Sequence, residues 1–314
     1  MLSGATNGTV GRYGEPPFMK LSVVIPLYNE AAVFDTLVAA IEATFDDQTQ
    51  FILIDDGSND TTRSLIEAKV ASDSRYCGLI FSRNFGHQAA VTAGMDRAQG
   101  DIVLVMDADL QDPPAAGLAL VKRVESGVDV AYGVRRKRKE GLLKRLAYWT
   151  YYRTLKATSS LDLPLDAGDF AAMSRRVVDA MKDLPERERY PRGLRCFVGF
   201  KHEAVEYERE ARAAGETKYN LGRLFRLAYA GLLGFSDAPL RLGLIFAAMY
   251  FVAAITFGII ALVVGTAPWW IAALLADGFC AISLLLGIIG AYLSRMHLET
   301  LGRPTYVIAE DISS

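Results

Sequence analysis

The sequence has few residues of the kinds that form disulfides or cysteine metal sites. It contains three cysteines in 314 residues, Cys77, Cys196 and Cys280, and they lie far apart. An odd number of widely spaced cysteines fits a reducing compartment and offers no metal-binding cluster. The chain also lacks an excess of positive charge, since its formal net charge is -2. We therefore expect no nucleic-acid partner.

Two further patterns are missing near the start of the chain. No Gly-x-Gly-x-x-Gly follows the first apolar run, residues 21–26, which argues against a dinucleotide-dependent dehydrogenase. No charged segment followed by an apolar one marks a secretory signal, so we expect the residues that follow to stay in the cytoplasm. Residues 1–18 are rich in Gly, Thr and Asn without periodicity, which predicts a disordered leader.

Apolar runs alternate with amphipathic segments across residues 19–220. This alternation predicts an α/β domain whose mainly parallel sheet is covered by helices on both faces. The predicted strands are residues 21–26, 51–54, 79–81, 102–106, 128–132 and 170–173. The predicted helices are residues 31–44, 61–72, 88–98, 115–126 and 175–183.

Two long apolar segments follow this domain. Residues 242–264 contain no charged side chain and residues 269–293 contain one, Asp277, so each can cross a hydrocarbon core of roughly 30 Å. The short link between them, residues 265–268, predicts an antiparallel transmembrane hairpin within residues 241–294. Arginines flank the hairpin but are absent from its link. By the positive-inside rule, both ends of the hairpin, including a tail at residues 295–314, face the cytoplasm.

The segment before the hairpin, residues 221–240, has apolar residues at helical spacing with arginines on another face. It predicts a helix that lies on the membrane surface, although an ordinary surface helix of the domain is the alternative. Glycines in the spans, such as Gly258 and Gly287, offer small-residue surfaces for helix packing. We therefore expect a homo-oligomer.

The segment Asp107-Ala-Asp-Leu-Gln-Asp-Pro-Pro114 carries the clearest chemical signal. It follows a buried apolar run, so Asp107 and Asp109 would stand at the carboxyl edge of the sheet, where α/β sheets bind ligands. Carboxylate oxygens there suit a hard divalent cation. Capping of the next helix is the alternative for these residues, and it is the role we expect for Asp112.

Polar residues follow three other predicted strands at the same edge. Asp55 and Asp56 could accept hydrogen bonds from a base or ribose, and Tyr28 could stack on the base. Arg83 could face a diphosphate. A turn with a helix cap is the alternative for the aspartates, and a surface salt bridge is the alternative for Arg83.

These motifs together resemble the polyisoprenyl-phosphate hexosyltransferases of glycosyltransferase family two, which have the Rossmann-like GT-A fold. The resemblance covers most of residues 21–240, and the 107–114 motif is the part most specific to this group. The Gln-x-x-Arg-Trp signature expected of processive polysaccharide synthases is absent from the chain. The matching segments are residues 24–30, 54–58, 82–86, 107–114, 166–170 and 209–219.

The resemblance implies a nucleotide-sugar donor held through a divalent metal, Mg²⁺ or Mn²⁺. The metal ligands it implies are Asp107, Asp109 and Gln111, with Asp109 also counted as catalytic. The donor-binding residues it implies are Pro26, Tyr28, Asn29, Glu30, Asp55, Asp56, Arg83, Asp107 and Arg135.

The resemblance also places a carboxylate, Asp166 or Asp169, beside the acceptor. Its role stays open between positioning the sugar, a residual general base and turn stabilisation, because a phosphate monoester is already largely dianionic and needs little proton removal. A dianionic acceptor needs cations instead, although a basic surface could equally attract lipid headgroups. The candidates for this contact are Lys144, Arg145, Arg209, Arg212 and Lys218.

The expected function is inverting, metal-dependent transfer of a hexose to a polyprenyl phosphate such as undecaprenyl phosphate. We expect glucose from UDP-glucose, with mannose from GDP-mannose as the alternative. A membrane-anchored nucleotide-sugar-binding protein without turnover is the alternative from another class.

Overall fold

The computed structural model describes residues 20–135, 167–187, 189–208, 248–253, 255–256, 258–260, 263 and 268–313. The predicted leader, residues 1–18, and the predicted interfacial helix, residues 221–240, lie outside the described residues.

An eight-stranded sheet forms the centre of the α/β domain, with strand order β7-β5-β6-β4-β1-β2-β3-β8. Four strand pairs are parallel, β1–β2, β1–β4, β2–β3 and β5–β7, and three are antiparallel, β4–β6, β5–β6 and β3–β8. The sheet is therefore mixed, with a parallel block of β4, β1, β2 and β3 and a further parallel pair, β5–β7, at one edge. The strands are β1 (Leu21–Leu27), β2 (Thr49–Asp55), β3 (Tyr76–Phe81), β4 (Ile102–Val105), β5 (Val130–Arg135), β6 (Ala167–Ser174), β7 (His202–Tyr207) and β8 (Ile308–Ser313).

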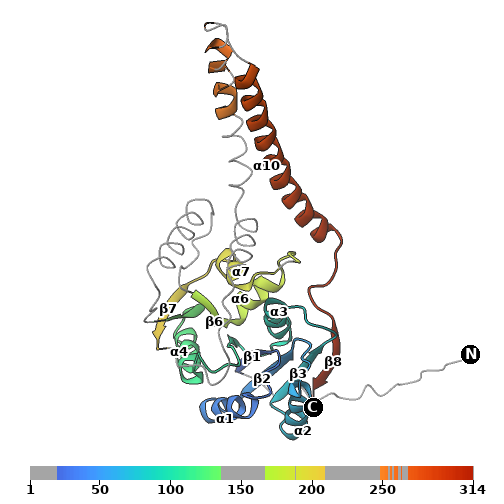
Figure 1. Cartoon of the computed structure of the whole chain (residues 1–314). Helices are drawn as coiled ribbons and strands as arrows, with labels where there is room; N and C mark the ends of the chain where they lie inside the picture. The colour runs from blue at the N-terminus through green and yellow to red at the C-terminus, as the bar shows by residue number, and fades with distance from the viewer. Residues whose placement is uncertain are drawn as a thin grey trace, which may run out of the picture.

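Helices cover both faces of this sheet (Figure 1). One hydrophobic cluster joins α1, α2 and α4 to one face, and a second joins α3, α6 and α7 to the other. Strands β1, β2 and β3 are buried along their whole length because both faces are covered, as expected for parallel strands. The helices are α1 (Phe34–Thr44), α2 (Thr62–Ser72), α3 (His87–Arg97), α4 (Pro114–Glu125), α6 (Arg175–Lys182) and α7 (Pro191–Phe197).

Every predicted strand and helix of the described α/β domain has a counterpart in the structure. The α/β architecture predicted from the alternation is thus confirmed. Three elements were not predicted: the short helix α7, the edge strand β7, and β8, which lies in the segment assigned to a tail. Their sequences are short or rich in charge, as in His202-Glu-Ala-Val-Glu-Tyr207, so they lack a strong apolar pattern.

Strand β8 returns the chain to the domain after the last helix and pairs antiparallel with β3. The two residues just before β8, Tyr306 and Val307, also contact the domain. The N–H of Ser82 donates to the carbonyl of Val307 at 3.0 Å, and the ring of Tyr306 stacks on Phe81 with centroids 5.3 Å apart. The hydroxyl of Tyr306 donates to Asp96 Oδ2 at 2.9 Å. Residues 306–313 are therefore part of the domain, not a separate tail.

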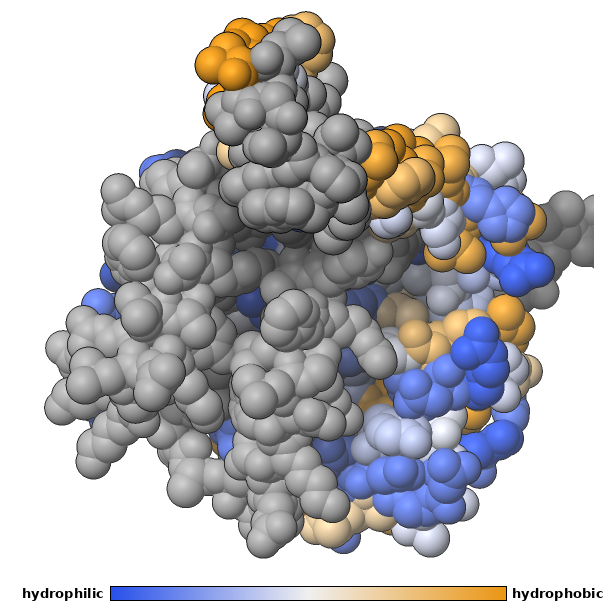
Figure 2. All heavy atoms as spheres, turned by 45° about the horizontal axis from the view of Figure 1, so that its top comes forward, coloured by the Kyte–Doolittle hydropathy of each residue, from blue (hydrophilic) through white to orange (hydrophobic). Residues whose placement is uncertain are grey.

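Helix α10 (Pro268–Thr300) projects away from the α/β domain (Figure 1). Its apolar side chains are exposed, and Figure 2 shows hydrophobic residues on its surface, with hydrophilic residues more frequent on the visible part of the domain below. Within it, residues 277–300 form the one described helix that is long and apolar enough to cross a membrane.

The predicted hairpin needs a second such helix, and the described residues do not contain one. The predicted second span, residues 269–293, lies within α10, which continues to Thr300. Of the predicted first span, residues 242–264, several lie outside the described residues, and its described apolar helix, Ala248–Ile260, is shorter than a membrane-crossing helix needs to be.

Candidate active site

The sheet has a topological switch point at β1. This strand pairs in parallel with β2 on one side and β4 on the other, so the connections that leave β1 and β4 run in opposite directions. In open α/β sheets, ligands bind in the crevice outside the carboxyl ends of such strands. The candidate site is therefore expected beyond Leu27 of β1 and Val105 of β4.

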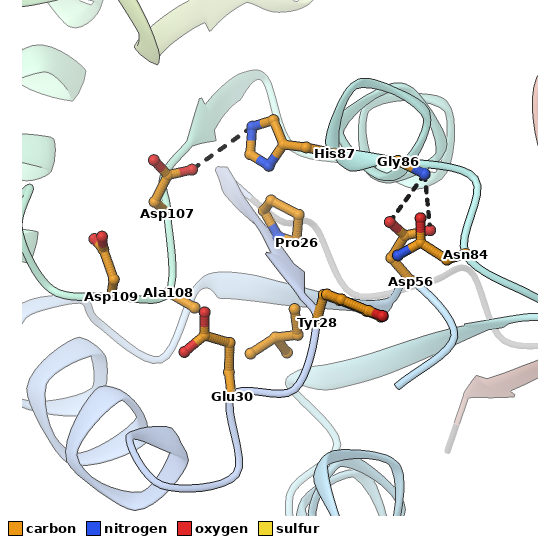
Figure 3. A pocket seen from close by; sticks show the side chains of 11 residues that line it. Pro26, Tyr28, Glu30, Asp56, Asn84, Gly86, His87, Asp107, Ala108 and Asp109 are labelled. Atoms are coloured by element: carbon orange, nitrogen blue, oxygen red, sulfur yellow. Dashed lines mark hydrogen bonds and ion pairs between the residues drawn. The ribbon is translucent and has the colours of Figure 1, made fainter. Parts of the chain in front are cut away.

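A cavity of about 720 Å³ opens at this crevice (Figure 3). Four of its lining residues are acidic, and His87 is the one basic residue among the described residues that line it. The lining residues are Pro26, Leu27, Tyr28, Glu30, Asp56, Asn84, Gly86, His87, Asp107, Ala108 and Asp109. Pro26, Tyr28, Glu30, Asp56, Asp107 and Asp109 were predicted from the sequence, and the fold brings them to one cavity.

The loops after β1 and β2 are linked to each other by Asn29. Its N–H donates to Ser58 Oγ at 2.9 Å, and its Oδ1 accepts the N–H of Asn59 at 2.8 Å. Asn29 has a positive φ of 56°, a conformation that asparagine tolerates better than most residues. The predicted donor-binding residue Asn29 thus shapes the wall of the cavity without lining it.

Asp55 and Asp56 are both buried, at 1% and 3% exposure. Asp55 Oδ1 accepts the N–H of Ser58 at 3.1 Å. Asp56 accepts the N–H groups of Phe85 at 2.7 Å and Gly86 at 2.9 Å, so it fixes the loop after β3 (Figure 3). Burial raises the pKa of Asp56 above its ordinary value, although these two N–H groups act in the opposite direction. Asp56 therefore holds the loop after β3 in place at the wall of the cavity.

Asp107 and Asp109 follow β4 and face the cavity. Burial raises the pKa of Asp107 to about 6; His87 lowers it, and the neighbouring carboxylates of Asp169, Asp112 and Asp109 raise it further. The turn that presents both side chains contains Leu110 with φ at 55°, a strained conformation for leucine. Strain and crowded like charges at one turn are typical of a functional site rather than a helix cap.

Asp112, Pro113 and Pro114 of the 107–114 motif have structural roles. Helix α4 begins at Pro114 with Pro113 as its N-cap, and no side chain caps it there. Asp112 is 1% exposed and accepts a hydrogen bond from the hydroxyl of Tyr207 on β7. The expected capping role of Asp112 is thus corrected to a buried contact between the turn before α4 and the edge strand β7. Gln111 is also buried and does not line the cavity, and its Oε1 has no hydrogen-bond partner among the residues that the structure describes.

Asp169, near the start of β6, is held by two helices. Its Oδ2 accepts a hydrogen bond from Gln88 Nε2 at 3.1 Å, and its Oδ1 lies 3.5 Å from Arg192 Nη2. Burial alone would raise the pKa of Asp169, but His87, Arg192 and Gln88 outweigh it and hold the pKa well below its usual range. A carboxylate held in this way is a poor proton acceptor, so of the roles left open for Asp169 positioning fits better than a general base.

Other predicted residues fall outside this cluster. Arg83 donates to the carbonyl of Asn84 at 2.9 Å and stacks on the ring of Phe85, and it does not line the cavity. Arg135 is the last residue of β5. Asp166, Lys144, Arg145, Arg209, Arg212 and Lys218 lie outside the described residues.

The structure adds His87, Gln88, Asn84 and Arg192 to the candidate site. His87 and Gln88 begin α3, directly after the Ser82–Gly86 segment, so their place beside a recognised strand end was the signal that could have found them. Arg192 lies on α7, which is seven residues long and has no periodic pattern to predict it. Its approach to Asp169 depends on tertiary packing alone.

Comparison with known proteins gives the family. The model of glycosyl transferase family 2 matches residues 22–181. The chain is 38% identical to an uncharacterized glycosyltransferase of Bacillus subtilis, over 92% of this chain and 93% of that one. It is 35% identical to a prophage bactoprenol glucosyl transferase homolog of Escherichia coli, over 92% and 98% of the two chains.

The fold has solved counterparts. Glucosyl-3-phosphoglycerate synthase of Mycobacterium tuberculosis, in complex with Mn²⁺, UDP-glucose and phosphoglyceric acid, superposes with a TM-score of 0.51 at 21% identity, covering 72% of this chain and 87% of that one. That likeness supports the GT-A-like fold. With the family match over half of the chain and relatives matched over nearly all of it, the chain belongs to glycosyltransferase family 2 and is a glycosyltransferase.

Proposed function

We propose that the enzyme transfers glucose from UDP-glucose to a polyprenyl phosphate such as undecaprenyl phosphate. The observation that carries this proposal is the convergence of Asp107 and Asp109 on the cavity at the switch point of the sheet. The polyprenyl acceptor is supported by relatives that are named bactoprenol glucosyl transferases and are matched over 92% of this chain.

The cavity suits a nucleotide sugar in size and lining. Its volume, about 720 Å³, lies in the range of small-molecule sites. Tyr28 is 45% exposed at its rim, so its ring is free to stack on a base. Glu30 and the other acidic residues favour hydroxyl groups, which can donate hydrogen bonds to them. The diphosphate is the one part of this donor that the acidic lining would repel.

A divalent ion resolves that repulsion. Among the described residues no group of three or more His, Cys, Asp or Glu side chains can hold a metal by itself. Mg²⁺ and Mn²⁺, however, commonly bind through one or two carboxylates together with substrate phosphates. Burial and the neighbouring carboxylates raise the pKa of Asp107, and a cation bound there would favour its charged form. Asp107 and Asp109 would hold the ion, with the buried Gln111 as a further oxygen donor, and the ion would neutralise charge on the leaving diphosphate.

The chain's own residues then have to align two anionic reactants. An oxygen of the acceptor phosphate forms a bond to the anomeric carbon while the bond from that carbon to the diphosphate oxygen breaks, and UDP leaves from the opposite side. This in-line displacement inverts the anomeric configuration. The acceptor enters as a dianion, so no side chain has to remove a proton. Alignment of the two reactants is therefore the main contribution of the protein to the rate of transfer.

The exposed apolar surface of α10 supports a place at the membrane. Seven large hydrophobic side chains along it have exposed fractions from 46% to 67%, a surface that requires lipid or a protein partner. They are Leu275, Phe279, Ile282, Leu286, Ile289, Leu293 and Met296. We propose that α10 crosses the bacterial inner membrane as one arm of the hairpin of residues 242–264 and 269–293. In this arrangement the active site faces the cytoplasm, and the spans pack into a homo-oligomer.

The test is transfer of radiolabelled glucose from UDP-glucose into lipid extractable by organic solvent, with purified protein and undecaprenyl phosphate. We expect labelled lipid in the presence of Mg²⁺ or Mn²⁺, its loss with EDTA, and its return when the metal is added again. Labelled lipid from GDP-mannose and not from UDP-glucose would overturn the proposed donor. Binding of UDP without transfer from either donor would favour a non-catalytic binding protein.

A further inference from the structure

His87 lies between two carboxylates that come from different strands. Its Nε2 is 3.7 Å from Asp107 Oδ1 and 3.6 Å from Asp169 Oδ2. The two aspartates stand at the same edge of the sheet because β4 and β6 are antiparallel neighbours, with Val105 opposite Ala171. One nitrogen atom therefore connects the carboxylate on the proposed donor side to the carboxylate on the proposed acceptor side.

The support beneath His87 is rigid. The preceding residue, Gly86, has its N–H bound by the buried carboxylate of Asp56. Farther along α3, Gly94 lets the helix approach the sheet so closely that a Cβ there would lie 2.2 Å from Val24 Cγ1. A side chain on an element anchored at both positions can hold other groups within a narrow geometry.

Three side chains approach Asp169, and they do so from two helices. Gln88 and His87 approach Oδ2 from α3, whereas Arg192 approaches Oδ1 from α7. Oδ2 therefore has a hydrogen bond from Gln88 and lies near His87, whereas Oδ1 has the ion pair with Arg192, so each oxygen of the carboxylate has a polar or charged neighbour from a different helix. His87 also lies 3.7 Å from Asp107 Oδ1, so it links Asp169 to the other side of the site.

We propose that His87 is a positioning residue of the transfer reaction, which holds Asp169 at a fixed place relative to Asp107 and thereby aligns the acceptor with the donor. This inference rests on the proposed function, since it takes Asp107 as part of the donor site. Without the imidazole, the two carboxylates would face each other with no positive or donating group between them. They would then move apart, and the reacting atoms would lose their alignment.

A positioning role has a specific kinetic signature. His87→Ala is expected to lower kcat about tenfold to a hundredfold, the scale of a misalignment of about 1 Å, with the donor KM within about threefold of the wild-type value. His87→Gln places an amide nitrogen close to the position of Nε2 and is expected to recover most of the loss. The matched control is His202→Gln on β7, where the histidine contacts the carbonyl of Gly199 and no part of the cavity.

A double-mutant cycle tests the route through Asp169. If His87 acts by holding Asp169, the two effects are not additive, and His87→Ala adds little to Asp169→Asn. Affinity for UDP with Mg²⁺, measured by calorimetry, and the unfolding temperature are expected to stay near wild type in His87→Ala. These two measurements do not depend on turnover, and they distinguish misalignment from misfolding.

Two patterns of results would overturn the inference. Wild-type kcat in His87→Ala would remove His87 from the reaction, and independent losses in the double mutant would remove the link to Asp169. Both patterns leave the proposed function intact, because wild-type transfer is then present. If transfer occurs from GDP-mannose alone, the proposed donor is wrong, but the same variants can be compared with GDP-mannose and the inference about His87 is still tested. If no nucleotide sugar supports transfer, both proposals are overturned.

Discussion

The carboxylates at the two ends of the parallel strands have opposite surroundings. At the amino end, Asp73 accepts hydrogen bonds from the guanidinium of Arg75, at 2.8 Å to Nη2, and these hold the pKa of Asp73 below its ordinary value. At the carboxyl end, Asp107 lies in a cavity with three other acidic residues, and burial raises its pKa to about 6.

The difference separates stability from function. A paired carboxylate stabilises the folded state, whereas a crowded and partly desolvated one costs stability and is retained where a ligand or ion compensates it. The same residue type is thus structural at the amino end of the parallel strands and, under the proposed function, part of the donor site at their carboxyl end. We therefore predict that substitutions at the carboxyl end mainly affect activity and that substitutions at the amino end mainly affect stability.

The largest effect is expected at the carboxyl end, on activity. Asp109→Asn should lower kcat about a hundredfold or more, the scale of losing one preorganised electrostatic stabiliser, while the protein stays folded. Asn keeps an oxygen that can accept the N–H of Gln111, as Asp109 Oδ1 does at 3.1 Å. The glucosyl transfer assay measures the loss, and Asp73→Asn is the matched control that should keep near wild-type activity. Full activity in Asp109→Asn would remove the contrast between the two ends.

The next effect is expected at the amino end, on stability. Asp73→Asn removes the charge that pairs with Arg75 and should lower the unfolding temperature by about 2–4 °C, corresponding to roughly 1 kcal/mol in a domain of this size. Because the folded-state pKa of Asp73 is lowered, its stabilisation is present above pH 4 and is lost as the pH falls through that lowered pKa. Thermal melts at pH 7 and at low pH test this, and an unchanged melt at pH 7 would contradict it.

A smaller effect of opposite sign is expected for Asp107 in protein kept free of metal with a chelator. Its folded-state pKa of about 6 lies above the ordinary value of 3.8, so the folded state binds the proton more tightly and loses stability as the pH rises from 4 to 6. Asp107→Asn should therefore raise the unfolding temperature by about 1–3 °C at pH 7 and leave it unchanged near pH 4. A variant that melts lower than wild type at pH 7 would contradict the crowding of charge in the cavity.

The smallest effect is expected for Arg63, whose guanidinium pairs with Glu67 and with Glu310 of β8 at 2.6 Å each on the exposed surface. Exposed pairs contribute little because water and salt screen them. Arg63→Gln should leave both the unfolding temperature and transfer activity within experimental error. A clear loss of stability would show that pairing matters even where it is fully solvated.

The central fold could be predicted from the sequence because its strands are buried on both faces. Residues 21–26 and 102–106 read as continuous apolar runs, and the structure has β1 and β4 there. Strands β7 and β8 are partly or largely exposed and carry charged residues, among them Glu203, Glu206, Glu310 and Asp311, so no apolar run marks them. Prediction failed where a strand gains its place from pairing rather than from burial.

The site was predictable in the same uneven way. Asp107 and Asp109 could be found because they follow a recognisable strand, and Tyr28, Glu30 and Asp56 because they follow others. His87 directly follows a recognisable strand end, which could have marked it as a site residue, but its contacts with two aspartates 20 and 82 residues farther along the chain depend on tertiary packing. Its place is set by the crossing of α3 over the sheet.

The pairing of β8 with β3 has a consequence for handling the protein. Strand β3 is Tyr-Cys-Gly-Leu-Ile-Phe, apolar and buried along its whole length, and β8 covers the side that would otherwise be a sheet edge. A truncation that removes residues 306–313 would expose this strand as a template for pairing with a second molecule. Glu310 and Asp311 of β8 pair with Arg63 and Arg97 of the domain, so ion pairs help to hold β8 in place. Shortened versions of the chain should therefore aggregate, and expression of the intact strand is the way to keep the domain soluble.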